Sequence, residues 1–163
     1  MNQATNNRSI QWLFFDFGGV LAEEGFTQGL QDLGREQGIN PETVLEKGVE
    51  LIHSTGYLLG QAPESSFWEG MRRELNIKGT DEELRSFVLK RFIPRPWIFK
   101  VIEELKNQQL HIAILSDQVD WLDKLNVAQD FFSSFDQIFN SYYLGKSKRD
   151  ADTFNHVCKK LNI

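Results

Sequence analysis

The sequence contains little cysteine, and its few histidines are scattered. Its only cysteine among 163 residues is Cys158, which excludes an internal disulfide and favours a reducing, cytoplasmic location. The polar segment 1–9 lacks the basic start and apolar run of a secretory signal. His53, His111 and His156 do not show a spacing such as His-x-x-x-His, so a histidine-based metal site is not indicated.

Long apolar runs and an excess of positive charge are also missing. No apolar run approaches the roughly 20 residues that span a bilayer, so we expect no membrane partner. A net charge of -5 argues against a general nucleic-acid binder, and the composition favours no particular oligomeric state. The acidic excess lies in one segment: residues 22–92 hold thirteen acidic and eight basic residues, and the remainder holds ten of each.

One short apolar run stands out because it ends in a single carboxylate. Residues 12–15 are all large and apolar, and Asp16 follows them, with Gly18 and Gly19 close behind. The run predicts a strand buried on both faces, as in parallel sheets. Ligands of open α/β sheets bind beyond the carboxyl ends of the strands, so Asp16 is a candidate active-site residue. The alternative is a helix-capping Asp16 in a turn.

The rest of the chain alternates strand and helix patterns on either side of a purely helical segment. Strands are predicted at 110–115 and 135–139, and helical stripes at 98–105, 119–127 and 154–161. This order predicts right-handed βαβ units and an α/β, Rossmann-like parallel sheet.

Residues 26–92 show helical spacing almost throughout, in four stripes. Asn40 before a proline predicts one helix start, and Thr80 with Glu83 forms the pattern of a capping box at another. We therefore predict a four-helix cap at 22–93, inserted into an α/β core made of 10–21 and 94–163.

Three segments, in order, resemble the motifs of the haloacid dehalogenase-like (HAD) superfamily. Segment 16–21, Asp-Phe-Gly-Gly-Val-Leu, is similar to its first motif. Ser116, after an apolar strand, resembles the second, and Lys148, in register with Phe154, resembles the third. Segment 57–77 looks like the helical cap of the branch that includes sugar-phosphatase-like and epoxide hydrolase N-terminal-like members.

The resemblance implies catalytic roles for Asp16 as nucleophile and for Lys148 as the cation beside it. It implies substrate binding by Ser116, Asp117 and Gly19.

The same resemblance implies a Mg²⁺ cofactor, held by Asp16 and by the backbone carbonyl of Gly18. The family's fourth motif, a strand with one or two Asp residues that complete the metal site, does not occur before Ile163. Full activity of these 163 residues alone is therefore not expected.

The motifs also depart from the family pattern. Gly18 stands where many phosphatases of the family have a second Asp, which serves as general acid and base. Asp117 replaces a usual Asn, and Arg149 and Ala151 replace two prolines, so we expect a less rigid third-motif loop.

The leading functional prediction is a Mg²⁺-dependent phosphatase of small phosphorylated metabolites that acts through an aspartyl-phosphate. One alternative is a dehalogenase in which Asp16 attacks carbon, and another is a catalytically silent relative that binds a ligand or a protein. Glu23 and Glu24 could border the cap entrance, although a solvated surface is the expectation favoured for both. Trp68 and Trp121 are expected in the core.

Overall fold

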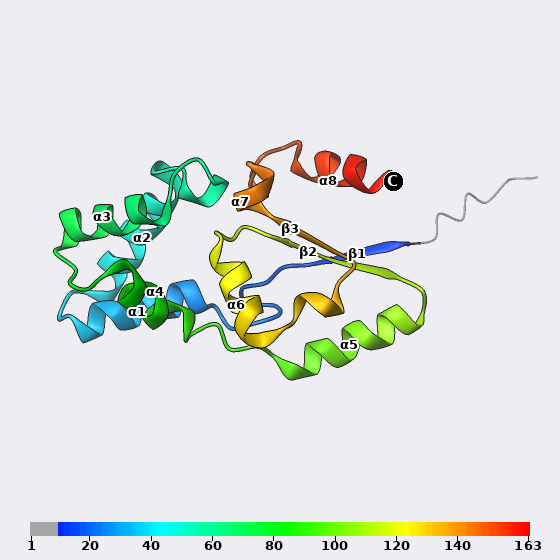
Figure 1. Ribbon diagram of the computed structural model, residues 1–163, viewed down its shortest axis with the longest axis horizontal. Helices are drawn as coiled ribbons and strands as arrows, with labels where there is room; N and C mark the ends of the chain where they lie inside the picture. Colours follow the sequence, from blue (N-terminus) through cyan, green and yellow to red (C-terminus); the bar gives the residue numbers. More distant parts are fainter. Residues whose placement is uncertain (1–9) are drawn as a thin grey trace, which may run out of the picture.

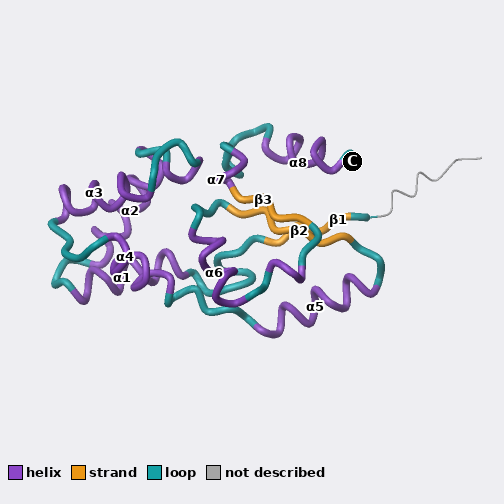
Figure 2. Tube along the Cα trace, in the orientation of Figure 1, coloured by secondary structure: helices purple, strands orange, loops and turns teal. Residues whose placement is uncertain are grey.

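The protein is an α/β fold built on a small parallel sheet, shown by a computed structural model that describes residues 10–163 (Figure 1). The strands are β1 (Trp12–Phe15), β2 (His111–Ser116) and β3 (Gln137–Asn140), in the order β1-β2-β3. All pairs are parallel, with Phe15 opposite Ile114 and Ser116 opposite Asn140. The three carboxyl ends therefore meet at one edge, which faces the helices on the left of Figure 2.

Helices cover both faces of this sheet. The helices α5 (Pro96–Asn107) and α6 (Trp121–Gln129) lie on one side, with the 3₁₀ turn η2 (Phe132–Ser134). On the other side lie α7 (Ser141–Leu144) and α8 (Thr153–Leu161). Alternate residues of β2 are buried in two different clusters: Ile112 and Ile114 belong to the main core, whereas Ala113 and Leu115 pack with Val157 of α8. This alternation makes β2 the central, doubly buried strand.

The segment between β1 and α5 is helical, as predicted. It contains α1 (Gly25–Glu36), α2 (Pro41–Ser54), the 3₁₀ turn η1 (Tyr57–Leu59), α3 (Glu64–Leu75) and α4 (Asp81–Leu89), which together we call the cap. The predicted starts are confirmed, because Asn40 Oδ1 accepts from the amides of Glu42 and Thr43 at 2.9 and 3.1 Å, and Thr80 and Glu83 form a capping box. The fold class is therefore confirmed, and the bounds of the two domains stay a prediction.

The cap and the sheet layer share one continuous hydrophobic core. Trp121 of α6 is fully buried and stacks on Trp68 of α3, with ring centroids 5.7 Å apart. Both indole N–H groups donate to the same oxygen of Glu64, at 2.9 Å from Trp68 and 3.0 Å from Trp121. The hydroxyl of the buried Tyr57 donates to Asp120 at the start of α6. Because these contacts join the cap to α6, the cap is fixed over the carboxyl ends of the strands.

The first strand differs from the prediction. Residues Trp12–Phe15 are each half-buried, whereas we expected a strand buried on both faces. The reason is topological, because β1 pairs only with β2 among the described residues and lies at an edge of the sheet. Asp16 nevertheless follows the carboxyl end of β1, as the pattern of the run indicated.

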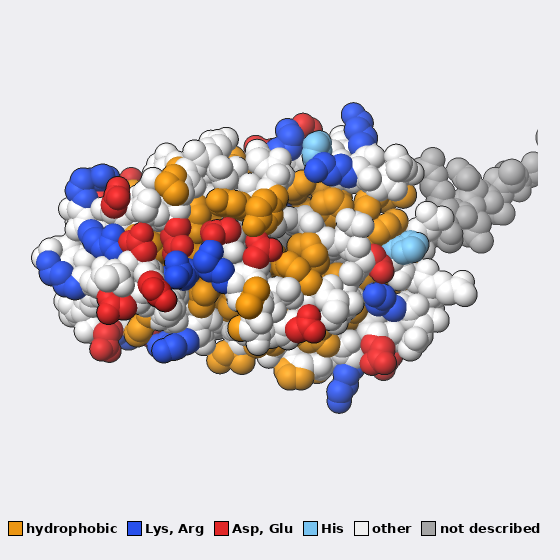
Figure 3. Space-filling model, in the orientation of Figure 1, with side chains coloured by type: hydrophobic (Ala, Val, Ile, Leu, Met, Phe, Trp, Pro, Cys, Tyr) orange, Lys and Arg blue, Asp and Glu red, His pale blue; other side chains and the backbone are white. Residues whose placement is uncertain are grey.

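The surface shown in Figure 3 carries both signs of charge over the cap helices, and hydrophobic side chains gather nearer the middle of the molecule. The acidic excess of segment 22–92 is thus interspersed with basic side chains on this face. No helix within residues 10–163 is both long enough and apolar enough to cross a membrane.

Candidate active site

Asp16 lies where β1 ends and the chain turns sharply toward the cap. The turn is held by the Phe17 carbonyl, which accepts from the amides of Val20, Leu21 and Ala22 at 3.3, 2.9 and 3.0 Å. Oδ1 of Asp16 accepts from its neighbour's amide, Phe17 N, at 2.8 Å and from Ser116 Oγ at 2.7 Å. Since Ser116 is the last residue of β2, the parallel pairing of β1 and β2 brings the two side chains together.

Lys148 reaches the same carboxylate from a loop that is distant in sequence. Its ammonium donates to Oδ2 of Asp16, so the two oxygens of this carboxylate have separate partners. The side chain of Asp16 remains 38% exposed and that of Lys148 28% exposed. The structure thus gathers Asp16, Ser116 and Lys148 into one cluster that is still open to a ligand. Because the sequence separations are large, this grouping depends on the whole fold.

The loop that carries Lys148 is held by hydrogen bonds, contrary to the flexibility we expected from its missing prolines. Oδ2 of Asp150 accepts from Ser147 N at 2.7 Å, and Thr153 Oγ1 donates to the Ser147 carbonyl at 2.6 Å. Ser147 and Thr153 are both buried. Side-chain bonds to the backbone therefore fix this loop in place of the two prolines.

Asp117 fixes the same loop from the sheet side. Its Oδ1 accepts from the backbone amide of Lys148 at 2.8 Å. Burial raises the pKa of the Asp117 carboxyl, and the charge of Asp16 adds to that effect, although the Lys148 amide and ammonium and the Arg149 guanidinium oppose it. The Asp that replaces the expected Asn thus positions Lys148. Its expected contact with substrate stays a prediction.

Gly18 and Gly19 line the turn beside Asp16, under the side chain of Glu24. Gly19 has φ +74°, and a Cβ there would come 2.2 Å from Glu24 Oε1, so this position favours glycine for both its backbone and its surroundings. The Gly19 carbonyl accepts from the Arg95 guanidinium, which also pairs with Glu23 at 2.8 Å. The Arg95 hydrogen bond lowers the pKa of the Glu23 carboxyl.

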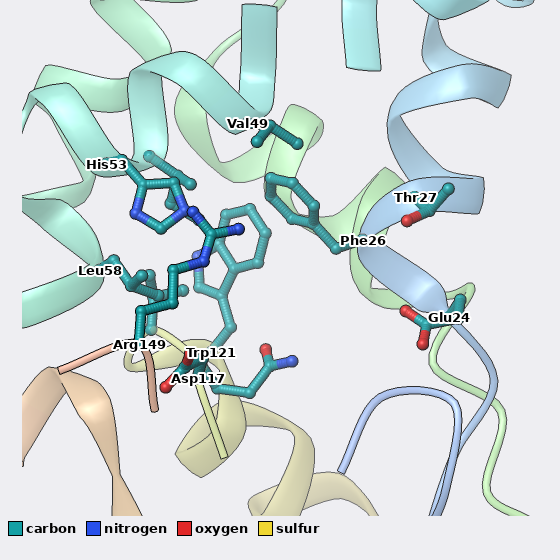
Figure 4. A pocket seen from close by; sticks show the side chains of 12 residues that line it. Glu24, Phe26, Thr27, Val49, His53, Leu58, Asp117, Trp121 and Arg149 are labelled. Atoms are coloured by element: carbon teal, nitrogen blue, oxygen red, sulfur yellow. The ribbon is translucent and has the colours of Figure 1, made fainter. Parts of the chain in front are cut away.

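A cleft of about 240 Å³ separates this edge of the sheet from the cap (Figure 4). Asp117 and Arg149 approach it from the sheet side, and Phe26, Val49 and His53 from the cap side. The remaining lining residues are Glu24, Thr27, Ile52, Leu58, Gln118, Val119 and Trp121. Since Asp117 bonds the Lys148 amide, the cleft lies next to the Asp16 cluster, and apolar side chains form much of its wall.

Sequence reasoning did not predict His53, Gln118 or Arg149 at this cleft. Glu24 is exposed, as expected, and it also lines the cleft, as do His53, Gln118 and Arg149. Arg149 carried a usable signal, because it directly follows the family lysine where the pattern has proline. The position of His53 depends on how the cap is placed at the carboxyl ends of the strands, which no local pattern contains.

The donor set fits a Mg²⁺ ion that keeps most of its coordination for water and substrate. Residues 10–163 do not contain a cluster of three or more His, Cys, Asp or Glu side chains suited to a metal. Mg²⁺ is, however, usually held by one or two protein carboxylates together with substrate phosphate. Asp16, whose side chain is 38% exposed, supplies one such carboxylate. Asp16 and the Gly18 carbonyl are the expected ligands.

The fold and the site define a class: an α/β protein with a helical cap and an Asp-Ser-Lys cluster at the strand ends. Comparison with known proteins identifies no matching family model and no matching curated protein. Solved structures do match. A HAD family enzyme from Bacteroides thetaiotaomicron superposes with TM-score 0.76 at 17% identity, over 96% of this chain and 80% of that one.

Two further structures extend the comparison. The same Bacteroides enzyme in complex with magnesium and inorganic phosphate matches with TM-score 0.73 at 18% identity, over 95% of this chain and 80% of that chain. An L-2-haloacid dehalogenase from Xanthobacter autotrophicus, with chloropropionic acid covalently bound, matches with TM-score 0.65 at 19% identity, over 95% of this chain and 66% of that chain. The chain therefore has the HAD-like fold.

Proposed function

We propose that the protein is a HAD-like hydrolase, and specifically a phosphatase of small phosphorylated metabolites that uses Asp16 as its nucleophile. The observation that carries this proposal is the Asp16 carboxylate, which lies at the end of β1 with Ser116 on one oxygen and Lys148 on the other. A hydroxyl and an ammonium beside a carboxylate are suited to hold the oxygens of a phosphoryl group as it transfers. The match to the Bacteroides enzyme that holds magnesium and phosphate supports the same chemistry.

The reaction has two steps. An oxygen of Asp16 attacks phosphorus, the bond from phosphorus to the ester oxygen breaks, and the alcohol leaves with a proton taken from solvent, because Gly18 has no acidic side chain. Water then attacks the phosphorus of the aspartyl-phosphate and gives a proton back to solvent, which releases inorganic phosphate and restores the Asp16 carboxylate. In both steps Lys148 and Ser116 hold oxygens of the transferring group, and bound Mg²⁺ supplies further charge neutralisation.

A second candidate is a dehalogenase, favoured by the match to the Xanthobacter enzyme and its covalently bound chloropropionic acid. In that reaction Asp16 attacks a carbon atom, and halide leaves. Gly18 is compatible with both chemistries. A third possibility is binding without turnover, which the sequence suggests because Gly18 replaces the usual second Asp.

One experiment separates these functions. The purified chain and Asp16→Asn are assayed against a panel of phosphate esters with Mg²⁺ and against 2-haloacids without metal. We expect phosphate release from the wild type only, together with an acid-stable, hydroxylamine-sensitive phosphoryl label on the wild type. Equal rates for the two proteins would refute Asp16 as nucleophile. Metal-free halide release without phosphatase activity would establish the second candidate.

A further inference from the structure

We propose that Arg149 and His53 form a recognition site for a carboxylate on the leaving group, so that the substrate is a small phosphate ester of a hydroxy acid. This inference rests on the proposed phosphatase function and names its substrate class. The two side chains line the same cleft, one from the core loop and one from α2 of the cap. In Figure 4 the Arg149 side chain extends across the cleft toward the ring of His53.

The first argument is that the Arg149 side chain is not directed at Asp16, which Lys148 contacts. Lys148 donates to Asp16, whereas Arg149, the next residue, lines the cleft. Hydrogen bonds from the Lys148 amide to Asp117, and from the Arg149 amide to Ser147 Oγ at 3.2 Å, fix the backbone between these two side chains. The loop therefore directs the Lys148 ammonium to Asp16 and the Arg149 guanidinium into the cleft.

The second argument is that both side chains are exposed, so a ligand that enters the cleft can reach them. Among residues 10–163, neither the guanidinium of Arg149 nor the imidazole of His53 forms a side-chain hydrogen bond or an ion pair. Asp117 is close enough for its pKa to be lowered by Arg149, but its hydrogen bond goes to the Lys148 amide. A guanidinium offers a planar fork that matches a carboxylate, and imidazole carries an N–H in either charge state. A ligand carboxylate in the cleft could therefore accept from both side chains.

The third argument concerns the rest of the leaving group. The phosphoryl group belongs to the Asp16 cluster, so an anion at Arg149 is a second anion of the same substrate. Phe26, Val49 and Leu58 give the cleft an apolar wall, and its volume of about 240 Å³ suits a body of a few carbon atoms. Glu24 and Asp117 also line the cleft and oppose a high negative charge. A singly charged carboxylate therefore fits better than a second phosphate.

A matched pair of esters tests the proposal. The compounds 3-phosphoglycerate and glycerol 3-phosphate share a phosphate ester and a three-carbon body, and they differ in carboxylate against hydroxymethyl. We expect wild-type kcat/KM to be at least about 10-fold higher for 3-phosphoglycerate. Arg149→Met is expected to lower that value about 10- to 100-fold, because charge-assisted hydrogen bonds are lost, and to change the value for glycerol 3-phosphate less than about 3-fold.

Two further variants sharpen the test. Arg149→Lys keeps the charge without the planar fork and is expected to recover only part of the preference. Lys146→Met removes a positive charge from the same loop, but Lys146 pairs with Asp152 at 2.9 Å and does not line the cleft. Lys146→Met is expected to keep the wild-type preference for 3-phosphoglycerate over glycerol 3-phosphate. A loss in Lys146→Met as large as in Arg149→Met would show a general charge effect and overturn the proposal.

Calorimetric binding to Asp16→Asn separates this inference from the proposed function. We expect that protein to bind 3-phosphoglycerate more tightly than glycerol 3-phosphate, and addition of Arg149→Met to abolish the difference. If neither ester is hydrolysed by the wild type but this binding pattern holds, the phosphatase proposal fails and the carboxylate site stands. Equal binding of the two esters would overturn the carboxylate site, whatever the rates of hydrolysis.

Discussion

Lys148 contacts the proposed nucleophile directly, because its ammonium donates to Asp16 Oδ2. Replacement by Met removes the positive charge that holds this carboxylate and the phosphoryl oxygens. We expect Lys148→Met to lower kcat for phosphate esters by about 10²- to 10³-fold, the range found when one preorganised donor is removed. Steady-state kinetics beside Lys146→Met provide the measurement, and a Lys148→Met rate within about 3-fold of that control would contradict the role.

Asp117 makes the stability of the folded protein depend on pH. Burial raises the pKa of its carboxyl in the folded protein, so folding favours the protonated form. Its contribution to stability is therefore fully present below the unfolded pKa of about 3.9 and is lost as pH rises through the folded pKa. An asparagine side chain at this position would remain neutral, and its carbonyl oxygen could still accept from the Lys148 amide.

We therefore expect Asp117→Asn to gain stability relative to the wild type as pH rises from about 4 to 7, by up to about 1 kcal/mol. Urea unfolding of both proteins across this range measures the difference. A difference that is independent of pH would show that Asp117 titrates alike in the folded and unfolded chains.

At this scale the sequence predicted Asp16, Ser116 and Lys148 as one group, and the structure places them in contact. The resemblance to the HAD motifs grouped them: local pattern indicated a strand end for Asp16 and Ser116, but it did not by itself connect Lys148 to them. His53 was not predicted, because its position depends on how the cap is placed at the carboxyl ends of the strands, and periodicity does not encode that placement.

At the scale of elements, the contact between η1 and α7 sets a close approach of two backbones. A Cβ at Gly60, which has φ +67°, would come 2.4 Å from the Tyr142 carbonyl oxygen, whereas Gly38 has φ +69° and nothing within 4 Å of such an atom. Both Ala variants incur the penalty of a left-handed backbone, roughly 1 to 2 kcal/mol. Gly60→Ala is expected to lose about 1 to 3 kcal/mol more than Gly38→Ala, because backbone must move.

The comparison of Gly60→Ala and Gly38→Ala is read from urea unfolding. Equal losses in the two variants would show that η1 can shift away from α7 without cost.

Glu64 joins three elements, since its carboxylate accepts from Trp68 of α3, Trp121 of α6 and Arg85 of α4. Its side chain is only 14% exposed. Glu64→Gln places an amide group against the Arg85 guanidinium or against the indoles, so a buried donor loses its partner. We expect a loss of about 1 to 3 kcal/mol in the free energy of unfolding. Glu69→Gln, an exposed change on the same helix, should stay within about 0.5 kcal/mol of the wild type.

The element boundaries were predictable where local signals are strong. The helix starts at Asn40 and Thr80 follow from capping chemistry that operates within a few residues. The burial of β1 was predicted wrongly, because a run of apolar residues cannot show whether a strand lies in the centre or at the edge of a sheet. That distinction depends on pairing between β1 and residues of β2 that are remote in sequence.

The whole molecule has one main hydrophobic core, which includes Phe67 of the cap as well as Ile114 of the sheet. A cap that shares its core with the sheet is not expected to unfold by itself. We therefore expect a single cooperative transition in urea, with coincident midpoints by far-ultraviolet circular dichroism and by tryptophan fluorescence. Two separated transitions would show that cap and core are independent units, as their sequence division into 22–93 and its flanks would allow.

The stacked indoles of Trp68 and Trp121 also give the molecule an optical property. Their ring planes are inclined by 21°, and one ring belongs to the cap and the other to α6. Two identical chromophores held this close exchange excitation energy, which splits their absorption into a pair of circular dichroism bands of opposite sign. The amplitude of that pair depends on the distance and angle between the rings, so it would report any displacement of the cap when a ligand enters the cleft, without an added label.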